Sequence, residues 1–287
     1  MRVGVSHLQW PSDRPFDQIL AEVADIGFLG VEGAREYFGR SAQLRTLLAD
    51  VELQMTAGSY AANWFDKEWM SRELDGLRSS AEFYASVGAE YLVAGSVGSP
   101  HRFRTAGHLP SGRSDGLSDY QWELLAETVS AAGEICLNEF ELPLVFINRA
   151  GTFVETGEEI DRFVSLTNPE TVFLAADTGQ LFYAGIDPTE FFERNVNRIR
   201  YVHLKEVNSD VHEQTVVGGG SYRDFVEMEG FPEVGTGAID FEAVIKILKG
   251  GGYDGWLVIE QDYTPRDPAV AAGASLEYVH SLLGLSA

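Results

Sequence analysis

The sequence has only one cysteine, Cys136, among its 287 residues. An intrachain disulfide is therefore impossible, and the cysteine content gives no sign of an oxidising compartment. Cys136 lies in the helix-like stretch ETVSAAGEICLNEF, where a small buried side chain is expected rather than a nucleophile.

Long apolar runs are also lacking. No run approaches the length of a membrane span, and no basic segment followed by an apolar one precedes the first strand-like stretch, MRVGVS. We therefore expect a cytoplasmic protein that does not bind membranes.

Basic residues are scarce, with 21 Lys and Arg against 44 Asp and Glu, which gives a formal net charge of −23. Such a surface repels phosphate backbones and anionic lipids, so nucleic acid is not an expected partner. The hydrophobic fraction of 45% and the charged fraction of 23% are those of a globular protein with a sizeable core.

Eight short apolar runs of strand length recur along the chain. They are residues 2–6, 28–32, 53–58, 90–95, 142–147, 171–176, 199–204 and 255–260. Between them lie segments with helical spacing, such as Phe16, Ile19, Leu20 and Val23. Strands that are apolar throughout, alternating with helices, indicate a single-domain α/β protein, a (β/α)8 TIM barrel over residues 1–287. The main competitor is a doubly wound open sheet, but no GxGxxG follows the first strand.

Two segments between the predicted elements are unusually long, residues 96–119 and 208–238. Both follow strands of the predicted barrel, and both leave it at the end where barrel enzymes carry their active sites. We interpret them as lids over that end, with mobile surface excursions as the alternative.

Polar side chains concentrate where the predicted strands end. The set comprises His7, Glu32, Tyr60, Ser96, Asn148, Arg149, Asp177, His203, Lys205 and Glu260. The carboxyl ends of barrel strands share one face, so these residues are predicted to line one pocket. For any single member, a buried and hydrogen-bonded structural role is the simpler interpretation.

Asp177, His203 and Glu260 form a mixed set of oxygen and nitrogen ligands. This set suits Mn²⁺, Mg²⁺, Co²⁺ or Zn²⁺ better than a metal that prefers thiolates. The sequence contains neither an HExxH motif nor a cysteine cluster, so the predicted metal site depends on the barrel bringing the three strands together.

The stretch from Leu117 to about Asp267 resembles the xylose-isomerase-like, sugar phosphate isomerase/epimerase barrels, and within them the inosose dehydratases. The motifs that carry this resemblance are DGLSDYQW, RAGTFVETGEEIDRF, ADTGQLFYAGIDP, IRYVHLKEV, EVGTGAIDF and GGYDGWLVIEQD. The resemblance implies a divalent metal, a polyhydroxylated substrate and removal of a proton next to a carbonyl. It also implies that Asp177, His203 and Glu260 are metal ligands, that Lys205 is the lysine of an HLK motif, and that Glu32 is the acid after the second strand.

The chain departs from this family at two motifs. Inosose dehydratases typically read HPHAGT where this chain has INRAGT, residues 147–152, and DTGH where it has DTGQ, residues 177–180. Ile147 cannot bind a metal, and Gln180 cannot cycle a proton as imidazole does. Arg149 adds a permanent cation near the expected metal. In one interpretation the metal is retained, with waters completing its ligand shell and Asn148 Oδ1 as the only nearby candidate for a fourth protein ligand. In the other, Arg149 replaces the metal and holds a substrate carbonyl or carboxylate.

The working hypothesis is a lyase that acts on a keto-sugar, inosose or related polyol. Glu260, Glu32 or a neutral Lys205 removes the α-proton, and the metal or Arg149 stabilises the enediolate. Loss of a β-substituent then gives dehydration or C-glycoside cleavage. The alternatives are a sugar epimerase or isomerase that uses the same enediolate, and a non-catalytic barrel that binds a sugar or serves as a partner subunit.

Five residues are predicted to bind the substrate. They are His7, Trp10, Tyr60, Asn148 and Gln180. The aromatic members are candidates for stacking on a sugar ring. A homo-oligomer or a complex with a second subunit is also an open possibility.

Overall fold

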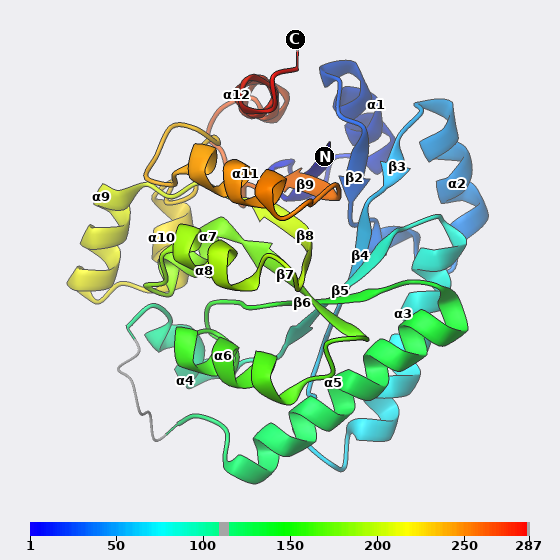
Figure 1. Ribbon diagram of the computed structural model, residues 1–287. Helices are drawn as coiled ribbons and strands as arrows, with labels where there is room; N and C mark the ends of the chain where they lie inside the picture. Colours follow the sequence, from blue (N-terminus) through cyan, green and yellow to red (C-terminus); the bar gives the residue numbers. More distant parts are fainter. Residues whose placement is uncertain (109–114, 286–287) are drawn as a thin grey trace.

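The computed structural model describes residues 1–108 and 115–285, which form a parallel barrel surrounded by helices (Figure 1). The strand order is β3-β2-β1-β9-β8-β7-β6-β5-β4, and every pairing is parallel. The strands are β1 (Arg2–Ser6), β2 (Gly30–Glu32), β3 (Gln54–Met55), β4 (Ala57–Ala62), β5 (Tyr91–Ser96), β6 (Leu144–Ile147), β7 (Val172–Asp177), β8 (Ile199–Leu204) and β9 (Trp256–Ile259).

The barrel is nearly closed because β3 and β4 are two parts of one extended segment. β3 pairs with β2 and β4 pairs with β5, so the segment 54–62 connects the two ends of the strand order. Counting this segment as one strand gives the eight strands that the sequence predicts. The predicted (β/α)8 barrel is therefore confirmed.

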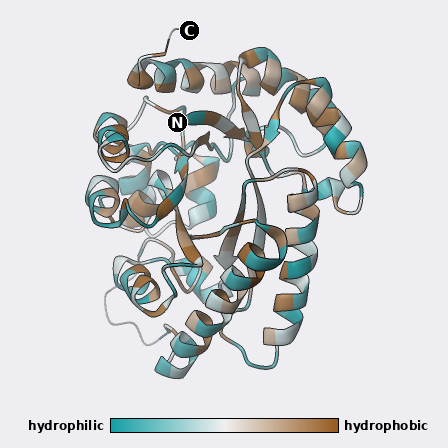
Figure 2. Ribbon diagram, turned by 45° about the vertical axis from the view of Figure 1, so that its right-hand side comes forward, coloured by the Kyte–Doolittle hydropathy of each residue, from teal (hydrophilic) through white to brown (hydrophobic). Residues whose placement is uncertain are grey.

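Helices surround the strands on the outside. The longer ones are α1 (Phe16–Ile26), α2 (Ser41–Asp50), α3 (Met70–Ser86), α5 (Asp119–Phe140), α6 (Gly157–Leu166), α8 (Pro188–Asn195), α11 (Phe241–Gly250) and α12 (Pro268–Leu283). Each carries both apolar and polar residues, shown brown and teal in Figure 2. In α1, for example, the side chains spaced three or four apart, from Phe16 to Val23, are the buried ones.

Two apolar cores result from this arrangement. The larger lies between strands and helices, and the smaller fills the inside of the barrel. The inner core consists of Ala57, Val93, Val145, Ile147, Ala175, Tyr201, Trp256 and Val258. Side chains alternate between the two faces of a strand, so the residue two positions after an inner one also points inward. Asp177, His203 and Glu260 each follow an inner residue by two positions.

The two segments predicted as lids contain short helices and contact each other. The first includes α4 (Pro100–Thr105), and the second includes α9 (Ser209–His212), a π-helical turn η3 (Glu213–Val217) and α10 (Tyr222–Glu227). His108 Nε2 donates a hydrogen bond to the carbonyl oxygen of Gly220, 3.0 Å away. Residues 109–114 of the first segment lie outside the described residues.

Arg102 anchors α4 to the barrel. Its guanidinium is fully buried, donates to the carbonyl oxygen of Thr152, and forms an ion pair with Glu159 at 2.7 Å. Glu159 also caps the start of α6. Loss of either partner would leave a buried charge unpaired, so this contact holds α4 in place.

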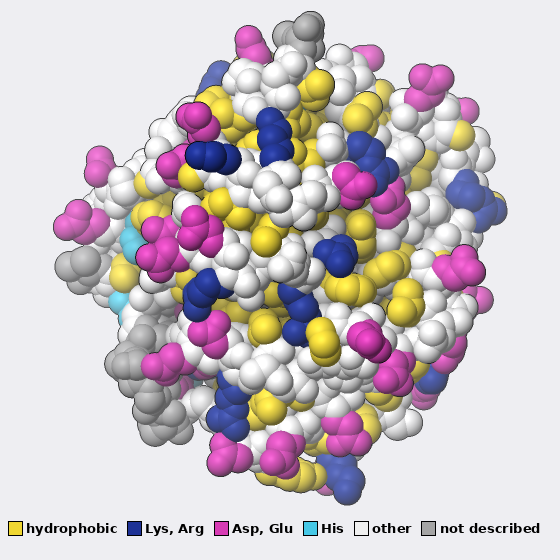
Figure 3. Space-filling model, viewed as in Figure 1, with side chains coloured by type: hydrophobic (Ala, Val, Ile, Leu, Met, Phe, Trp, Pro, Cys, Tyr) yellow, Lys and Arg dark blue, Asp and Glu magenta, His cyan; other side chains and the backbone are white. Residues whose placement is uncertain are grey.

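Acidic side chains are spread over the face shown in Figure 3 rather than gathered in one patch. This distribution agrees with a general role of the negative charge in solubility. In the part of the chain that the structure describes, no helix has the length and apolar character needed to cross a membrane.

Candidate active site

Four of the predicted strand-end groups converge at the carboxyl end of the barrel. Asp177 ends β7 and pairs in register with His203 of β8, while Glu260 follows β9 directly. Glu32 ends β2 and approaches from the opposite side. All four side chains are buried, so their charges must be satisfied by one another or by a ligand.

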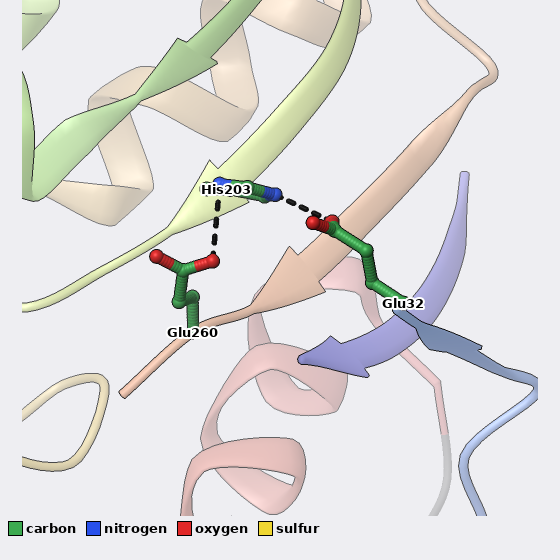
Figure 4. Close-up of side chains that lie close together, drawn as sticks. All are labelled: Glu32, His203 and Glu260. Carbon is green, nitrogen blue, oxygen red and sulfur yellow. Dashed lines mark hydrogen bonds and ion pairs between the residues drawn. The ribbon is translucent and has the colours of Figure 1, made fainter. Parts of the chain in front are cut away.

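The imidazole of His203 is held from one side by Glu32 (Figure 4). His203 Nε2 lies 2.6 Å from Glu32 Oε2, and the Tyr201 hydroxyl donates to the same oxygen at 2.7 Å. A carboxylate accepts hydrogen bonds, so Nε2 carries the proton. In the neutral imidazole, Nδ1 then has a free lone pair.

That lone pair faces two more carboxylates. His203 Nδ1 lies 3.4 Å from Glu260 Oε2 and 3.6 Å from Asp177 Oδ2. Within the described residues, neither Nδ1 nor Asp177 Oδ2 has a hydrogen-bond partner. Buried polar atoms without partners call for an explanation, and a bound cation is one.

A group of buried ligand atoms in this cluster could hold a metal ion. One ligand atom each from Glu32, His203 and Glu260 lies within 4.8 Å of the others. In the absence of a metal, burial disfavours the charged imidazole, but Glu32 and Glu260 outweigh it and raise the pKa of His203 well above its usual value. The metal-free cluster would therefore contain an imidazolium between carboxylates.

Lys205 lies beside this cluster as a fully buried ammonium. Its Nζ is 2.6 Å from Asp262 Oδ2, 2.7 Å from Glu260 Oε1 and 3.9 Å from Asp177 Oδ2. Burial lowers the pKa of Lys205, but Asp262 and Glu260 outweigh burial and raise it well above the usual value. These contacts do not favour the neutral Lys205 base considered from the sequence, and they favour a proton donor.

The carboxyl of Glu260, in contrast, has a lowered pKa. Burial raises the pKa of this carboxyl, but the cations of Lys205, His203 and Arg149 outweigh it and lower the pKa below its usual range. Glu260 is therefore ionised and able to accept a proton. A hydrogen bond joins this acceptor to the Lys205 donor.

The DTGQ motif positions Lys205. The hydroxyl of Thr178 donates to the carbonyl oxygen of Lys205 at 2.7 Å and accepts from its amide nitrogen at 2.9 Å. A Cβ at Gly179 would lie 2.5 Å from Lys205 Cγ, so this position has no room for a side chain. Gln180 donates its backbone N–H to Asp177 Oδ1 and its side-chain amide to the Tyr222 hydroxyl.

A cavity of about 920 Å³ opens beside the cluster. Arg149, Gln180 and Tyr222 lie on the side of the cavity next to Asp177 and Glu260. Although burial lowers the pKa of Arg149, the carboxylates of Glu260, Asp262 and Asp177 outweigh it and raise that pKa. Its guanidinium is exposed within the cavity and makes no hydrogen bond or ion pair with any described residue.

The other predicted substrate contacts are divided between the cavity and its surroundings. Tyr60 lines the cavity, although its hydroxyl donates to Glu73 Oε2 at 3.0 Å. His7 contacts the backbone carbonyl of Glu32 through Nδ1 at 2.9 Å. Trp10 is only 3% exposed, and its indole donates to Glu22, so its position does not favour stacking on a substrate.

Asn148 is buried, and its Nδ2 has no partner in the described part of the chain. Strand alternation places it with Phe146 of the outer core, whereas Arg149 follows the inner Ile147. This placement does not favour Asn148 as a fourth metal ligand.

Three site residues were missed by the sequence reasoning: Tyr201, Tyr222 and Asp262. Asp262 follows Glu260 by two positions, so alternation could have identified it. Tyr201 precedes His203 by two positions and could have been found in the same way. Tyr222 lies in α10, and no pattern in the sequence connects that helix to the site.

Glu155 joins the segment after β5, which contains Gly107, to the loop after β6, which contains Gly151. One of its oxygens accepts from the amide of Gly107 and the other from the amide of Gly151, both at 2.8 Å. Burial raises the pKa of Glu155, these amides and Arg102 partly oppose it, and the pKa is raised to about 7. Because the folded state holds this proton more tightly than the unfolded chain, the group reduces stability as pH rises from about 4.5 to about 7.

We therefore expect Glu155→Gln to gain stability relative to the parent protein as pH rises. Between pH 5 and pH 8 the difference in unfolding free energy should shift by about 2 kcal/mol in favour of the variant. Urea unfolding of both proteins at the two pH values measures this shift. A pH-independent difference would show that Glu155 does not titrate in this range.

Comparison with known proteins identifies the family. The model for the xylose isomerase-like TIM barrel matches residues 20–282. The chain belongs to this family. An inosose dehydratase from Geobacillus kaustophilus (strain HTA426) is 32% identical, with 98% of this chain and 94% of that protein covered. One from Clostridium botulinum (strain Eklund 17B / Type B) is 29% identical over 94% of this chain and 92% of that protein. The resemblance predicted from the sequence is confirmed.

Solved structures of low sequence identity share the fold. A 3-keto-D-glucoside 4-epimerase from E. coli superimposes with a TM-score of 0.73 at 17% identity, covering 98% of this chain and 99% of that one. A D-allulose 3-epimerase from Methylomonas sp., in complex with D-allulose, gives a TM-score of 0.74 at 17% identity, covering 98% and 96%. At this level of identity the likeness concerns the barrel alone.

Proposed function

We propose that this chain is a lyase that removes water from an inosose or a related keto-polyol. The observation that carries the proposal is the buried pair of Glu260 and Lys205, an ionised acceptor and a charged donor 2.7 Å apart beside a large cavity. The inosose dehydratase relatives, which cover nearly the whole chain, support the same reaction class. The expected partner is a small-molecule polyol or keto-sugar.

Glu260 and Lys205 together can make both proton transfers that a β-elimination needs. Glu260 takes the proton from the carbon next to the carbonyl, and the C–H electrons form an enediolate. When the neighbouring C–O bond breaks, Lys205 protonates the departing hydroxyl, which leaves as water. The neutral lysine then recovers its proton from Glu260 through their hydrogen bond, and both groups return to their resting charges.

Arg149 is the candidate for holding the substrate oxygen on which negative charge develops. Its guanidinium is open to the cavity and has no partner among the described residues. A cation that is already in position when charge develops stabilises the enediolate without reorganisation. A lysine at this position would keep the charge but would lack the planar guanidinium, which can donate two parallel hydrogen bonds.

The residues that would hold a divalent metal here are Asp177, His203 and Glu260. His203 Nδ1 lies 3.4 Å from Glu260 Oε2 and 3.6 Å from Asp177 Oδ2, and both distances are close to the roughly 3.0–3.5 Å that separates ligands bound at about 2.1 Å. Glu32 and His203 Nε2 are too close, at 2.6 Å, to have an ion between them, so Glu32 orients the imidazole.

The local charge also fits a dication. Four carboxylates, those of Glu32, Asp177, Glu260 and Asp262, surround the two cationic side chains of Lys205 and Arg149. When bound, a divalent metal supplies Lewis-acid polarisation of the substrate carbonyl. Mn²⁺, Co²⁺, Zn²⁺ and Mg²⁺ all accept this ligand set.

We expect about one equivalent of divalent metal per chain in purified protein, and at least tenfold weaker retention in Asp177→Asn, since one ligand charge is lost. Elemental analysis after dialysis measures both. As a control, Asp161→Asn changes an exposed carboxylate of α6 and should leave the metal content unchanged. A metal-free protein with full activity would assign the electrophilic role to Arg149 alone.

The first alternative function is a sugar epimerase or isomerase, because Glu260 and Lys205 could also return a proton to the enediolate. A non-catalytic partner subunit is the remaining alternative, supported by Ile147 and Arg149 in place of two family histidines. Incubation of the purified chain with an inosose distinguishes all three. Loss of one water supports the proposal, interconversion of isomers supports the epimerase, and no reaction supports the partner subunit.

A further inference from the structure

The cavity is larger than the proposed substrate requires. Its volume of about 920 Å³ lies near the upper end of the roughly 300–1,000 Å³ found for drug-sized ligands. A six-carbon keto-polyol has about a dozen heavy atoms, roughly half of such a ligand, so it fills only part of this space. The remainder must hold water or a second part of the substrate.

Part of the cavity lining is an apolar wall. We call this wall the outer wall and define it as Phe38, Ala61, Tyr84, Val97 and Phe103. Two of its rings are unusually open, with Phe38 49% and Phe103 51% exposed. Large exposed aromatic side chains that line a concave surface mark a place where an apolar group binds.

The exposed rings of Phe103 and Phe38 are both held in place by packing against neighbouring residues. A Cβ at Gly151 would lie 2.3 Å from Phe103 Cδ1, and one at Gly98 would lie 3.1 Å from Cε2, so the ring rests on two glycines. Gly151 also has a φ of +80°, which other residues adopt rarely. Phe38 packs against Phe83 with ring centroids 5.1 Å apart. Rings ordered before binding lose little entropy when a ligand stacks on them.

The charged side chains of the cavity do not select an ionic ligand. Among the described residues that line it, the charged ones are Arg35 and Arg149, and the carboxylates of Glu260, Asp262 and Asp177 act on Arg149 from beside the cavity. A neutral aromatic group fits the rings of the outer wall and can also stack under a guanidinium.

We propose that the outer wall binds an aromatic substituent on the sugar ring, so that the preferred substrate is an arylated keto-glycoside rather than a free inosose. This inference rests on the proposed function and specifies its substrate class. In a 3-keto-glycoside the β-substituent is the alkoxy group at carbon 1. The C–H bond at carbon 2 breaks, its electrons form the C1–C2 double bond, the C1–O bond breaks, and Lys205 protonates the departing alcohol.

Benzyl and methyl 3-keto-β-D-glucosides are suitable test substrates, because their leaving alcohols have similar acidity and differ mainly in the ring. We expect kcat/KM to be about tenfold to hundredfold higher for the benzyl compound, through burial of the ring. Phe103→Ala should reduce this benzyl-to-methyl ratio about tenfold. Tyr120→Ala, which removes an exposed ring of α5 outside the cavity, should leave the ratio unchanged.

Equal kcat/KM values for the two glycosides would overturn the inference while dehydration of an inosose still supported the proposed function. If neither glycoside nor inosose reacted, the proposed function would fail, and calorimetry with unreactive benzyl and methyl glucosides would decide the inference separately. Tighter binding of benzyl glucoside, lost in Phe103→Ala, would support it. An unchanged ratio together with a change in oligomeric state in Phe103→Ala would assign the ring to a protein contact and overturn it.

Discussion

Glu260→Gln is expected to abolish both α-proton exchange and water loss, each by about a thousandfold or more. The amide cannot accept the proton that the ionised carboxylate takes, and general base catalysis is worth roughly 10²–10⁴ in rate. Exchange is measured by NMR in D₂O with an inosose, and water loss by mass spectrometry. Glu139→Gln, which changes an exposed carboxylate paired with Arg78, serves as the matched control and should retain both activities.

Lys205→Met should separate the two activities. Water loss is expected to fall by roughly 10²–10⁴ because no proton donor remains for the leaving hydroxyl, while α-proton exchange continues. The lysine lowers the pKa of Glu260, so its removal leaves a stronger base. Removing one partner of a buried ion pair costs roughly 3–5 kcal/mol, so circular dichroism must first show that the variant is folded. Simultaneous loss of exchange in a folded variant would instead make Lys205 the base.

Arg149→Met is expected to lower kcat/KM for an inosose by roughly 10²–10³, the cost of losing one preorganised donor to a developing negative charge. Arg149→Lys should recover part of the loss, because the charge remains but the two-pronged geometry does not. The surface change Arg194→Met, in α8, should have no effect. Activity in Arg149→Met equal to that of the parent protein would remove this residue from the mechanism.

The positions of the strand-end residues were predictable because the place of a residue along a barrel strand determines where its side chain lies. Strand alternation and a common carboxyl end suffice to bring Asp177, His203 and Glu260 together, although 26 and 57 residues separate them in sequence. The register Asp177–His203 in the structure is the direct result. Glu32 and Lys205 belonged to the same predicted strand-end set, and the family resemblance implied a role for each of them.

Other features depend on side-chain contacts that no periodic pattern encodes. The sequence could not show that Lys205 lies between Glu260 and Asp262, a contact that changes the residue from a possible neutral base into a proton donor. It also could not show that Trp10 donates to Glu22 in the core rather than reaching the cavity. The cavity wall requires loops from several units to meet, and loop conformation depends on tertiary contacts such as those of Arg102.

One incubation tests the central claim most directly, the elimination of water through the Glu260–Lys205 pair. The purified chain is mixed with an inosose in D₂O, and substrate and product are followed by NMR and mass spectrometry. The account predicts a product that has lost one water, and no such product with Glu260→Gln. An isomeric product that carries solvent deuterium and retains all its oxygens would contradict it.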